Sequence, residues 1–418
     1  MKFMGWRRPD GRTGTRNYVA VIPSVFCAAK TAERIAAQVE GAICLRHPVG
    51  CTQVGFDFEL TARTLIAMGT HPNLAAVLVV GLGCERFKPE ELYEGIKKSG
   101  KPVEMLVIQE EGGSGPTIEK GVRILREFAL SALGKPREEC DASELIVALK
   151  CGGTDATSGL AANPTLGVMS DMLCAAGGSA ILSELNELIS TEDMLAARAV
   201  NETVAKKVYD AVFEIEEVLR SGCDYRFPGR NELISPGNFQ GGVSSIVEKA
   251  LGGVHKSGTS PIVDVLDYAV PPEKDKRGLF LMKYESQDGE VVTGMVGCGA
   301  QIVAFTTGRG NPTGFPFVPV IKVTGNDFCF QKMKADMDYN ASPIIAGAKT
   351  IKEMGEDFYE KIIRVASGEP VKAELMGADE LFVIGRRQGR QAGAIGFSGS
   401  KTSGKDCGSS GAGQKEIT

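Results

Sequence analysis

Ala75-Ala-Val-Leu-Val-Val80 is a short apolar run, followed at once by the turn Gly81-Leu-Gly83-Cys84-Glu85-Arg86. After this turn, a helix is expected from about Pro89 to Lys98. A short strand that is apolar along its whole length, bounded by glycine and followed by a helix, is typical of a parallel sheet covered by helices on both faces.

The same alternation of short apolar runs and helical stretches continues along the chain. The expected strands are residues 18–22, 42–45, 75–80, 103–108, 145–149, 180–182, 278–282, 301–305 and 317–322. The expected helices are residues 28–39, 56–68, 89–98, 116–133, 165–176, 192–221 and 351–366. This order predicts an α/β protein with two Rossmann-like open parallel-sheet domains, each with helices on both faces.

Domain boundaries are placed by composition. The polar break at residues 136–141 separates a first α/β domain, residues 1–136, from a second, residues 137–388. Residues 389–418 are rich in glycine, serine and lysine, and we expect them to form a flexible tail.

Composition excludes several classes of protein. The net charge is −5 with a sequence pI of about 5.6 and no basic stripe, so nucleic acid is not an expected partner. No apolar run is long enough to cross a membrane, and no export signal is visible, so we expect a cytoplasmic protein. The 11 cysteines are then expected to be free thiols, and the 3 histidines are too few for a multi-histidine metal site.

Three strand tips each deliver a cysteine into a loop that contains glycine. These are Cys51 after the second strand, Cys84 after the third and Cys151 after the fifth. Ligands of open parallel sheets bind at the carboxyl ends of the strands, so the thiols are candidate metal ligands. His47 lies four residues before Cys51 and is a further candidate ligand or an acid–base partner. A buried structural role for these cysteines is about equally compatible with the pattern.

Other loops carry groups suited to a sugar acid. His255 and Lys256 lie in a loop rich in glycine and hydroxyl groups, for which a helix stop is an equal alternative. Asn238 lies in Ser235-Pro-Gly237-Asn238. Thr307 and Arg309 follow a strand directly, and a guanidinium group flanked by glycine is well placed to bind a carboxylate in two-pronged fashion.

Several of these motifs resemble the altronate and galactarate dehydratase family. The opening Gly5-Trp-Arg-Arg8-Pro-Asp10-Gly-Arg12-Thr-Gly14-Thr-Arg16-Asn17-Tyr18 is similar to the start of that family's catalytic region. The loops around Cys51, around Cys84-Glu85 and over Cys151-Gly-Gly-Thr-Asp155 are similar to family motifs as well, and the resemblance extends from Gly5 to about Arg387.

The resemblance implies dehydration of an altronate-like aldonate or aldarate to a 2-keto-3-deoxy sugar acid, a lyase reaction of hexuronate catabolism, with iron as the metal. It also implies a separate small subunit in place of the family's small N-terminal domain, and thus a homo- or hetero-oligomer. Two segments depart from the family pattern, at His47-Pro-Val-Gly-Cys51-Thr and at Leu281-Met-Lys-Tyr-Glu-Ser, and the second bears on the substrate.

Dehydration of a sugar acid requires a base for the proton next to the carboxylate and a cation for the enediolate that forms. The hypothesis is that Fe²⁺ is held by Cys51, Cys84 and Cys151, with His47 as a fourth ligand; an iron–sulfur cluster and Mn²⁺ are the alternatives. His255 or Lys256 is the expected base, with Asp155 as second candidate. Arg309 is the expected carboxylate clamp, and the remaining substrate-binding candidates are Glu85, Asn238 and Thr307.

Two other functions compete with this one. A related branch of the family releases sulfite from sulfolactate; it is expected to lack cysteines at the positions of Cys51 and Cys84, so it ranks second. A non-catalytic subunit that binds a sugar acid would carry the same glycine-rich loops without converging thiols, and ranks third.

Overall fold

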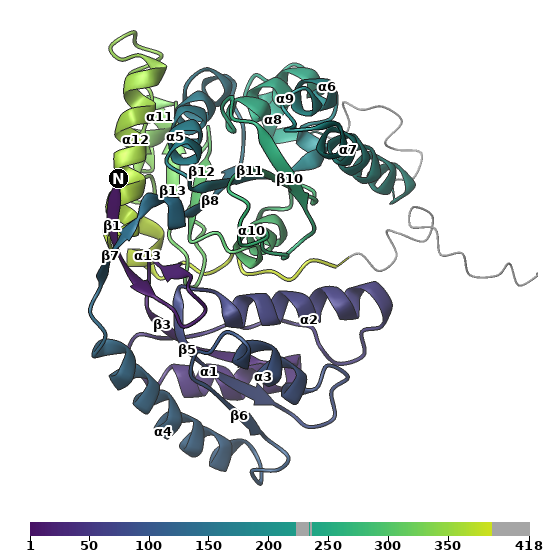
Figure 1. The fold of residues 1–418 in the computed structure, drawn as a ribbon, viewed down its shortest axis with the longest axis vertical. Coiled ribbons are helices and arrows are strands. Elements are labelled where there is room, and N and C mark those ends of the chain that lie inside the picture. Colours follow the sequence, from purple (N-terminus) through teal and green to yellow (C-terminus); the bar gives the residue numbers. More distant parts are fainter. Residues whose placement is uncertain (223–233, 235, 387–418) are drawn as a thin grey trace, which may run out of the picture.

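The computed structural model describes residues 1–222, 234 and 236–386. Two parallel sheets lie one above the other in Figure 1, each with its own helices. We call the four-stranded sheet, with the order β4-β3-β5-β6, the small sheet, and the seven-stranded sheet, with the order β10-β11-β9-β8-β12-β13-β14, the large sheet. The predicted α/β fold with open parallel sheets is confirmed.

The small sheet is buried on both faces. The apolar run over residues 75–80 forms β5 (Leu74–Gly81), every residue of which is buried. It pairs in parallel with β3 (Tyr18–Pro23) and β6 (Val103–Val107), and β3 pairs in parallel with β4 (Ala42–Cys44). Helices α1 (Ala29–Ala36) and α4 (Ser114–Leu133) cover one face, and α2 (Gly55–Thr70) and α3 (Pro89–Lys97) cover the other.

The large sheet is also entirely parallel. Its strands are β8 (Ile146–Cys151), β9 (Ser179–Leu182), β10 (Ile262–Leu266), β11 (Gly278–Met282), β12 (Ile302–Thr306), β13 (Val320–Thr324) and β14 (Tyr339–Asn340). The sequence did not predict β10 or β14, which are edge strands. Strand β13 begins later than expected because Pro319, which has no N–H to donate, immediately precedes it.

Helices cover both faces of the large sheet. On one face lie α5 (Asn163–Ala175), α12 (Ile351–Ala366) and α7 (Glu202–Gly222), and on the other lies α10 (Asp288–Gly297), which packs against α2. The core beneath α10 includes side chains from both sheets, so the two units share apolar contacts. The shorter helices are η1 (Phe26–Ala28), η2 (Ala142–Glu144), η3 (Ser158–Ala162), η4 (Leu185–Glu187), α6 (Glu192–Ala196), α8 (Pro236–Gln240), α9 (Ile246–His255), α11 (Asp327–Lys332) and α13 (Lys372–Met376).

The helix expected over residues 192–221 is two helices, α6 and α7. The chain between them is held to strand β10, because the backbone N–H of Val200 donates to the carbonyl oxygen of Ile262 (3.1 Å). The Asn201 side chain then accepts a hydrogen bond from the N–H of Val204 (3.0 Å) and starts α7. A tertiary contact therefore interrupts a pattern that is locally helical.

The N-terminal segment forms a third, antiparallel sheet with the order β2-β1-β7. Its strands are β1 (Lys2–Arg7), β2 (Thr13–Gly14) and β7 (Glu138–Asp141). Phe3 of β1 is buried in the core of the large sheet, and β1 lies beside α12 in Figure 1. The first strand of the chain thus packs against the second half of the molecule, across the boundary expected at residues 136–141.

The opening motif ties these parts together. Arg8 donates to the carbonyl oxygens of Pro72 (2.6 Å) and Arg16 (2.9 Å). Arg16 forms a buried ion pair with Glu374 (2.6 Å) and donates to the carbonyl oxygen of Val365 (2.8 Å). These contacts join the N-terminal segment to β5 and to the C-terminal helices, so the motif has a structural role here.

Among the described helices, none combines the length and the apolar character needed to cross a bilayer. The expected tail, residues 389–418, lies outside the described residues.

Candidate active site

The topology of the large sheet points to the gap between β8 and β12. From β8 the chain passes to β9 on one side, whereas β12 lies on the other side of β8 and leads to β13. Ligands of open α/β sheets bind at such a switch point, outside the carboxyl ends of the strands. The two loops that leave these strands are held together here: Gly152 N–H donates to Thr306 O (2.8 Å) and Gly308 N–H donates to Gly153 O (2.8 Å).

A buried group of charged side chains lies beneath this switch point. Glu184, in the residues after β9, is fully buried between two lysines. Lys150 on β8 donates to Glu184 Oε1 (2.5 Å) and pairs with Asp288 at the start of α10 (2.8 Å). The backbone N–H of Cys151 donates to Glu184 Oε2 (2.9 Å).

The thiol of Cys151 extends this group toward α9. Its Sγ donates to Glu187 Oε2 (3.1 Å) and accepts a hydrogen bond from Lys256 Nζ (3.0 Å). Lys256 also contacts Glu184 Oε2. Lys249 on α9 pairs with Glu187 (3.2 Å). We call Lys150, Cys151, Glu184, Glu187, Lys249, Lys256 and Asp288 the lysine–carboxylate cluster.

Charge compensation sets the protonation states in this cluster. Burial alone would lower the pKa of Lys150 and of Lys256, but the neighbouring negative groups, including Glu184, outweigh burial and raise both pKa values. Burial alone would raise the pKa of Glu184, but the two lysines lower it to about 2. Burial, followed by the charges of Glu184 and Glu187, raises the pKa of Cys151 to about 12. At neutral pH both lysines and Glu184 are therefore charged, and the thiol is neutral.

The backbone at Glu184 is strained. Its φ of 67° lies in the left-handed region, which costs a residue with a side chain about 1–3 kcal/mol. Such strain persists where surrounding contacts over-determine a conformation, and here the two lysines and the Cys151 N–H fix the carboxylate. The short π-helix η3 follows the Cys151 loop, and π-turns of this kind are frequent at functional sites.

Thr154 connects the buried cluster to the protein surface. Its hydroxyl accepts a hydrogen bond from Lys249 Nζ (3.0 Å), and its backbone N–H donates to Asn238 Oδ1 (2.9 Å). The exposed side chain of Arg309 lies over Gly153 and donates to the carbonyl oxygen of Gly237 (3.3 Å). Within the described part of the chain, no carboxylate pairs with Arg309. Arg309 thus places an exposed positive charge above the buried cluster, at what we call the mouth of the site.

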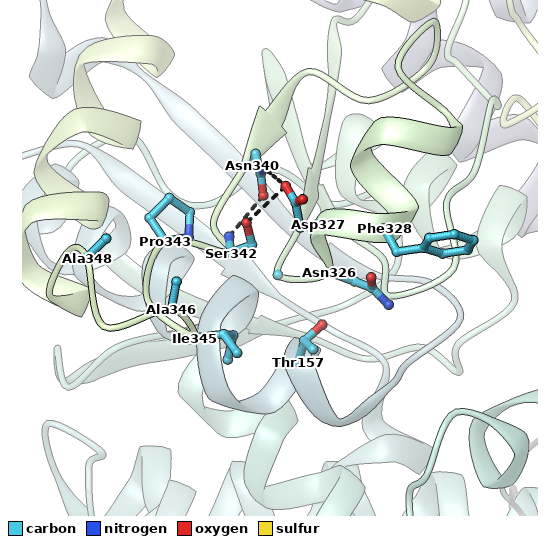
Figure 2. Close-up of a pocket in the computed structure, with 11 residues that line it drawn as sticks. Thr157, Asn326, Asp327, Phe328, Asn340, Ser342, Pro343, Ile345, Ala346 and Ala348 are labelled. Carbon is cyan, nitrogen blue, oxygen red and sulfur yellow. Dashed lines mark hydrogen bonds between the residues drawn. The ribbon is translucent and has the colours of Figure 1, made fainter.

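A cavity of about 680 Å³ lies on the other side of Asp155, at the ends of β13 and β14. Figure 2 shows its polar wall, where the Ser342 hydroxyl and the Asn340 amide donate to Asp327, while the Phe328 ring points away. Asp155 joins this cavity to the site, because Asn326 of the cavity wall donates to Asp155 Oδ2 (2.9 Å).

The structure places the three catalytic candidates predicted from sequence in different surroundings. Lys256 lies in the cluster, but the neighbouring negative groups raise its pKa and keep it protonated. It therefore lacks the free amine that the expected role as base requires. His255 is exposed at the end of α9, whereas its neighbour Lys256 is buried, so the expected role of His255 as base is not supported. Asp155 Oδ1 is occupied by Thr157 and Ser158, which makes it a cap for the following turn.

The substrate-binding candidates are divided between the two sheets. Arg309 is exposed at the mouth of the site, whereas Asn238 is buried and its amide oxygen accepts from the Thr154 N–H. Thr307 is buried, and its hydroxyl accepts from the backbone N–H groups of Arg309 (3.3 Å) and Gly310 (3.0 Å), so it shapes the clamp loop and does not face the mouth. Glu85 belongs to the small sheet, and its carboxylate already accepts hydrogen bonds from neighbouring residues there.

Glu85 fills the switch point of the small sheet, between β3 and β5. Its Oε1 accepts from the Ser24 hydroxyl (2.6 Å) and the Leu82 N–H (3.0 Å), and its Oε2 accepts from the Gly83 N–H (2.6 Å). Burial alone would raise the pKa of Glu85, but these hydrogen bonds outweigh it and lower the pKa. A buried carboxylate that is satisfied by its own loop offers no place for a substrate hydroxyl.

The four expected metal ligands do not come together. Cys51 and Cys84 are exposed in neighbouring loops of the small sheet, whereas Cys151 is buried in the large sheet. His47 is buried, with Nε2 bonded to the carbonyl oxygen of Pro23 (2.7 Å) and Nδ1 near the N–H of Val49, and burial lowers its pKa to about 4. No three of these four residues form a cluster of ligand atoms in the described part of the chain, so a metal site formed by them stays a prediction.

Within the described residues, a different set of ligand atoms is clustered. Cys151, Glu184 and Glu187 each offer one atom, and the three atoms lie within 4.8 Å of one another. The lysines already contact these atoms, with Lys256 between the thiol and Glu184. The donor set therefore does not fit a metal ion while Lys256 holds its place. Iron binding stays a prediction from the resemblance.

Sequence reasoning missed Glu184, Glu187 and Asp288, and assigned no role to Lys150 or Lys249. A signal was present: Ser183-Glu184-Leu-Asn-Glu187 directly follows a strand, as the Cys151 loop does. Examining the residues after every strand would have placed both carboxylates at the same edge as Cys151.

Comparisons with known proteins cover nearly the whole chain. Residues 142–388 match the model of "D-galactarate/Altronate dehydratase, C-terminal", and residues 5–132 match that of "D-galactarate dehydratase/Altronate hydrolase, second domain". The lysine–carboxylate cluster and Arg309 lie within the first of these matches.

Individual relatives carry different names. The chain is 37% identical over 390 residues to the (2R)-sulfolactate sulfo-lyase subunit beta of Chromohalobacter salexigens, covering 92% of this chain and 97% of the relative. It is 35% identical over 398 residues to altronate dehydratase of Bacillus subtilis, covering 91% and 77%. It is 35% identical over 387 residues to galactarate dehydratase (L-threo-forming) of Escherichia coli, covering 88% and 73%.

Proposed function

Because this chain belongs to the D-galactarate/altronate dehydratase family, we propose that it is a lyase that dehydrates a sugar acid to a 2-keto-3-deoxy sugar acid. The reaction takes place at the switch point between β8 and β12. Sugar-acid dehydratases among its relatives support this class of reaction, and the residues at the switch point support its place.

One observation carries the proposal. Arg309 is an exposed cation without a carboxylate partner in the described structure, and it lies over Gly153 at the mouth of a buried acid–base cluster. Thr154 connects the mouth to Lys249 and therefore to Glu187. An anion-binding group beside a proton acceptor is what removal of a proton next to a carboxylate requires.

Substrate binding begins at Arg309. Its guanidinium group binds the carboxylate of the sugar acid with two parallel hydrogen bonds, and Asn238 binds a hydroxyl of the sugar chain. Thr307 holds the backbone N–H groups of Arg309 and Gly310 and so fixes the position of the clamp. The carbon next to the carboxylate is then directed toward Thr154 and the cluster.

Glu187 is the proposed base. One of its oxygens accepts from Cys151 and pairs with Lys249, and the other makes no hydrogen bond within the described residues. Its side chain is 12% exposed, while that of Glu184 is fully buried, so it is the carboxylate of this pair that a substrate can reach. Glu187 takes the proton from C2, and the electron pair of that bond moves into the enediolate.

Lys249 is the proposed acid. As the double bond forms between C2 and C3, the bond from C3 to its hydroxyl breaks, and Lys249 protonates the departing hydroxide to give water. The enol then gains a proton at C3 and loses the proton of its C2 hydroxyl, which gives the 2-keto acid. The positive charges of Arg309 and of the cluster stabilise the negative charge of the enediolate.

The experiment is a substrate panel of aldonic and aldaric acids, with 2-keto acid formation as the readout. Glu187→Gln removes the base with little change in size and is expected to abolish turnover, while Glu40→Gln, on the exposed surface, is its matched control. Turnover that survives in Glu187→Gln would remove Glu187 from the mechanism, and no turnover of any sugar acid by the wild type would overturn the proposal.

Release of sulfite from sulfolactate is the second candidate. The chain covers 97% of the relative that carries this name, a larger share than for the dehydratases. The first step is the same, because the proton removed again lies next to a carboxylate, but sulfite leaves as a stable anion and needs no acid. Measuring sulfite release from sulfolactate in the same panel decides between the two leaving groups, and Lys249→Met should impair dehydration alone.

A partner chain is proposed as well. The sulfo-lyase relative is named as subunit beta, which supports an enzyme built from more than one chain. The proposed partner is a small subunit that completes the site. Turnover by the purified chain alone, at a rate that a co-expressed small subunit does not change, would contradict this part of the proposal.

A further inference from the structure

The three clustered ligand atoms of Cys151, Glu184 and Glu187 form a candidate site for a cation. One thiol and two carboxylates within 4.8 Å of one another are a donor set that divalent transition metals accept. In the described residues, no other set of three or more histidine, cysteine or acidic side chains is arranged in this way. Among the described residues, this set is therefore the candidate site for a cation.

A cation is already present there. The ammonium group of Lys256 lies 3.0 Å from Cys151 Sγ and contacts Glu184 Oε2. Lys150 takes the other oxygen of Glu184 (2.5 Å), and Lys249 takes Glu187 Oε2 (3.2 Å). Each ligand atom that a metal would use is thus in contact with a lysine.

The position of Lys256 is fixed by the chain around it. Helix α9 begins with Ser245, whose hydroxyl accepts from the N–H of Glu248 (3.2 Å), and ends at His255. Arg198 donates to the hydroxyl of Ser257 (3.0 Å), the residue after Lys256. The ammonium group is buried with the rest of the side chain, so leaving the cluster would require moving the end of α9.

We propose that the ammonium group of Lys256 is the resident cation of this site, and that a divalent metal ion and this ammonium group exclude one another. Two positive ions cannot share three ligand atoms at these distances, because their repulsion in a buried site is larger than at the surface. One consequence rests on the proposed function. In that reaction, Lys256 supplies the positive charge near the enediolate that a metal ion would otherwise supply.

The test is titration of the full chain with Co²⁺, followed by the absorption band of a cobalt–thiolate bond. Lys256→Met removes the charge and keeps most of the apolar length, and we expect it to gain a band that depends on Cys151. Its affinity for Co²⁺ should exceed that of the wild type by about tenfold or more, as expected when a like charge next to the ion is removed. Lys256→Arg keeps the charge and should show no such band.

Controls separate this site from the exposed thiols. Cys151→Ser, alone and combined with Lys256→Met, identifies the part of the signal that comes from Cys151, because Cys51 and Cys84 remain in both. A Cys151-dependent band in the wild type, or equal Co²⁺ affinity in Lys256→Met and Lys256→Arg, would overturn the proposal. If Lys256→Met does not fold, Lys256→Gln replaces it. A Cys151-dependent cobalt band in the wild type would still contradict the proposal. None of these readouts requires substrate, so they stand even if the proposed lyase activity fails.

Discussion

Each of the two parallel sheets has a switch point with a charged side chain. The two points differ in whether that side chain already has partners within the protein. In the small sheet, the buried carboxylate of Glu85 is held by the Ser24 hydroxyl and by the N–H groups of Leu82 and Gly83. In the large sheet, Arg309 lies exposed at the mouth without a carboxylate partner in the described residues. Both points have a cysteine in a glycine-containing loop, so the local sequence does not distinguish them.

What distinguishes the two points is whether the charged group is already satisfied. A carboxylate that accepts hydrogen bonds from its own loop has no remaining affinity for a ligand and contributes to stability. A guanidinium group that has only a backbone carbonyl and an amide oxygen as partners retains its affinity for an anion. The comparison therefore predicts catalytic effects for changes at the large sheet and stability effects for changes at the small sheet.

The largest expected effect on activity is that of Glu187→Gln. Loss of a general base lowers kcat by roughly 10²- to 10⁴-fold. The substitution keeps the size of the side chain but removes the charge that pairs with the buried Lys249, so the melting temperature should fall as well. Steady-state kinetics with the best substrate of the panel, together with thermal unfolding, measures both. A variant that retains wild-type kcat would show that the large-sheet switch point is not the site of proton removal.

Replacing Arg309 by Lys is expected to have a smaller effect, mainly on KM. Lysine keeps the charge but loses the two-pronged geometry, and a charge-assisted hydrogen bond is worth about 1.5–3 kcal/mol, which corresponds to a rise in KM of roughly 10- to 100-fold. The kcat should fall less than KM rises, because lysine keeps the positive charge that stabilises the enediolate. An unchanged KM would remove the carboxylate clamp from the mechanism.

At the small sheet, Glu85→Gln should lower stability and leave kcat and KM unchanged. The lost charge-assisted hydrogen bonds are worth about 1–3 kcal/mol of unfolding free energy. The sign with pH follows from the lowered pKa of Glu85: its stabilising contribution is present above the ordinary glutamate pKa and is lost as pH falls through the folded value. Denaturant unfolding should therefore show a difference between wild type and variant at pH 7 that shrinks under acid conditions.

Buried lysines in two parts of the molecule show why burial alone does not identify a functional group. Lys101 is buried near Arg8 and Arg12 and donates only to backbone carbonyl oxygens, of His71 (2.7 Å) and Leu74 (3.1 Å). Burial, followed by those two arginines, lowers its pKa well below the ordinary value. The lysine–carboxylate cluster has the opposite balance, and its lysines have raised pKa values.

The sequence predicts all strands of the small sheet and the inner strands of the large sheet, because each is a short apolar run between turn residues, but it does not predict the edge strands β10 and β14. The pairing of β1 with β7 could not be predicted from periodicity, since it joins residues that are more than 130 positions apart. For the same reason the cluster escaped prediction: Glu184 and Lys256 come from separate loops, and only tertiary contact brings them to Cys151. Arg309 was predictable because its position after a strand is a local feature.

The smallest expected effects are those of Cys51→Ser and Cys84→Ser. Both thiols are exposed at the small sheet and are absent from the one clustered ligand set of the described residues, so kcat/KM should stay close to that of the wild type. Cys151→Ser should reduce activity more, because its thiol contacts both Glu187 and Lys256. Steady-state kinetics of the three single variants makes the comparison directly. A large loss in Cys84→Ser, with the fold intact, would mean that the small-sheet switch point takes part in catalysis after all, and the division between a structural and a catalytic switch point would then be wrong.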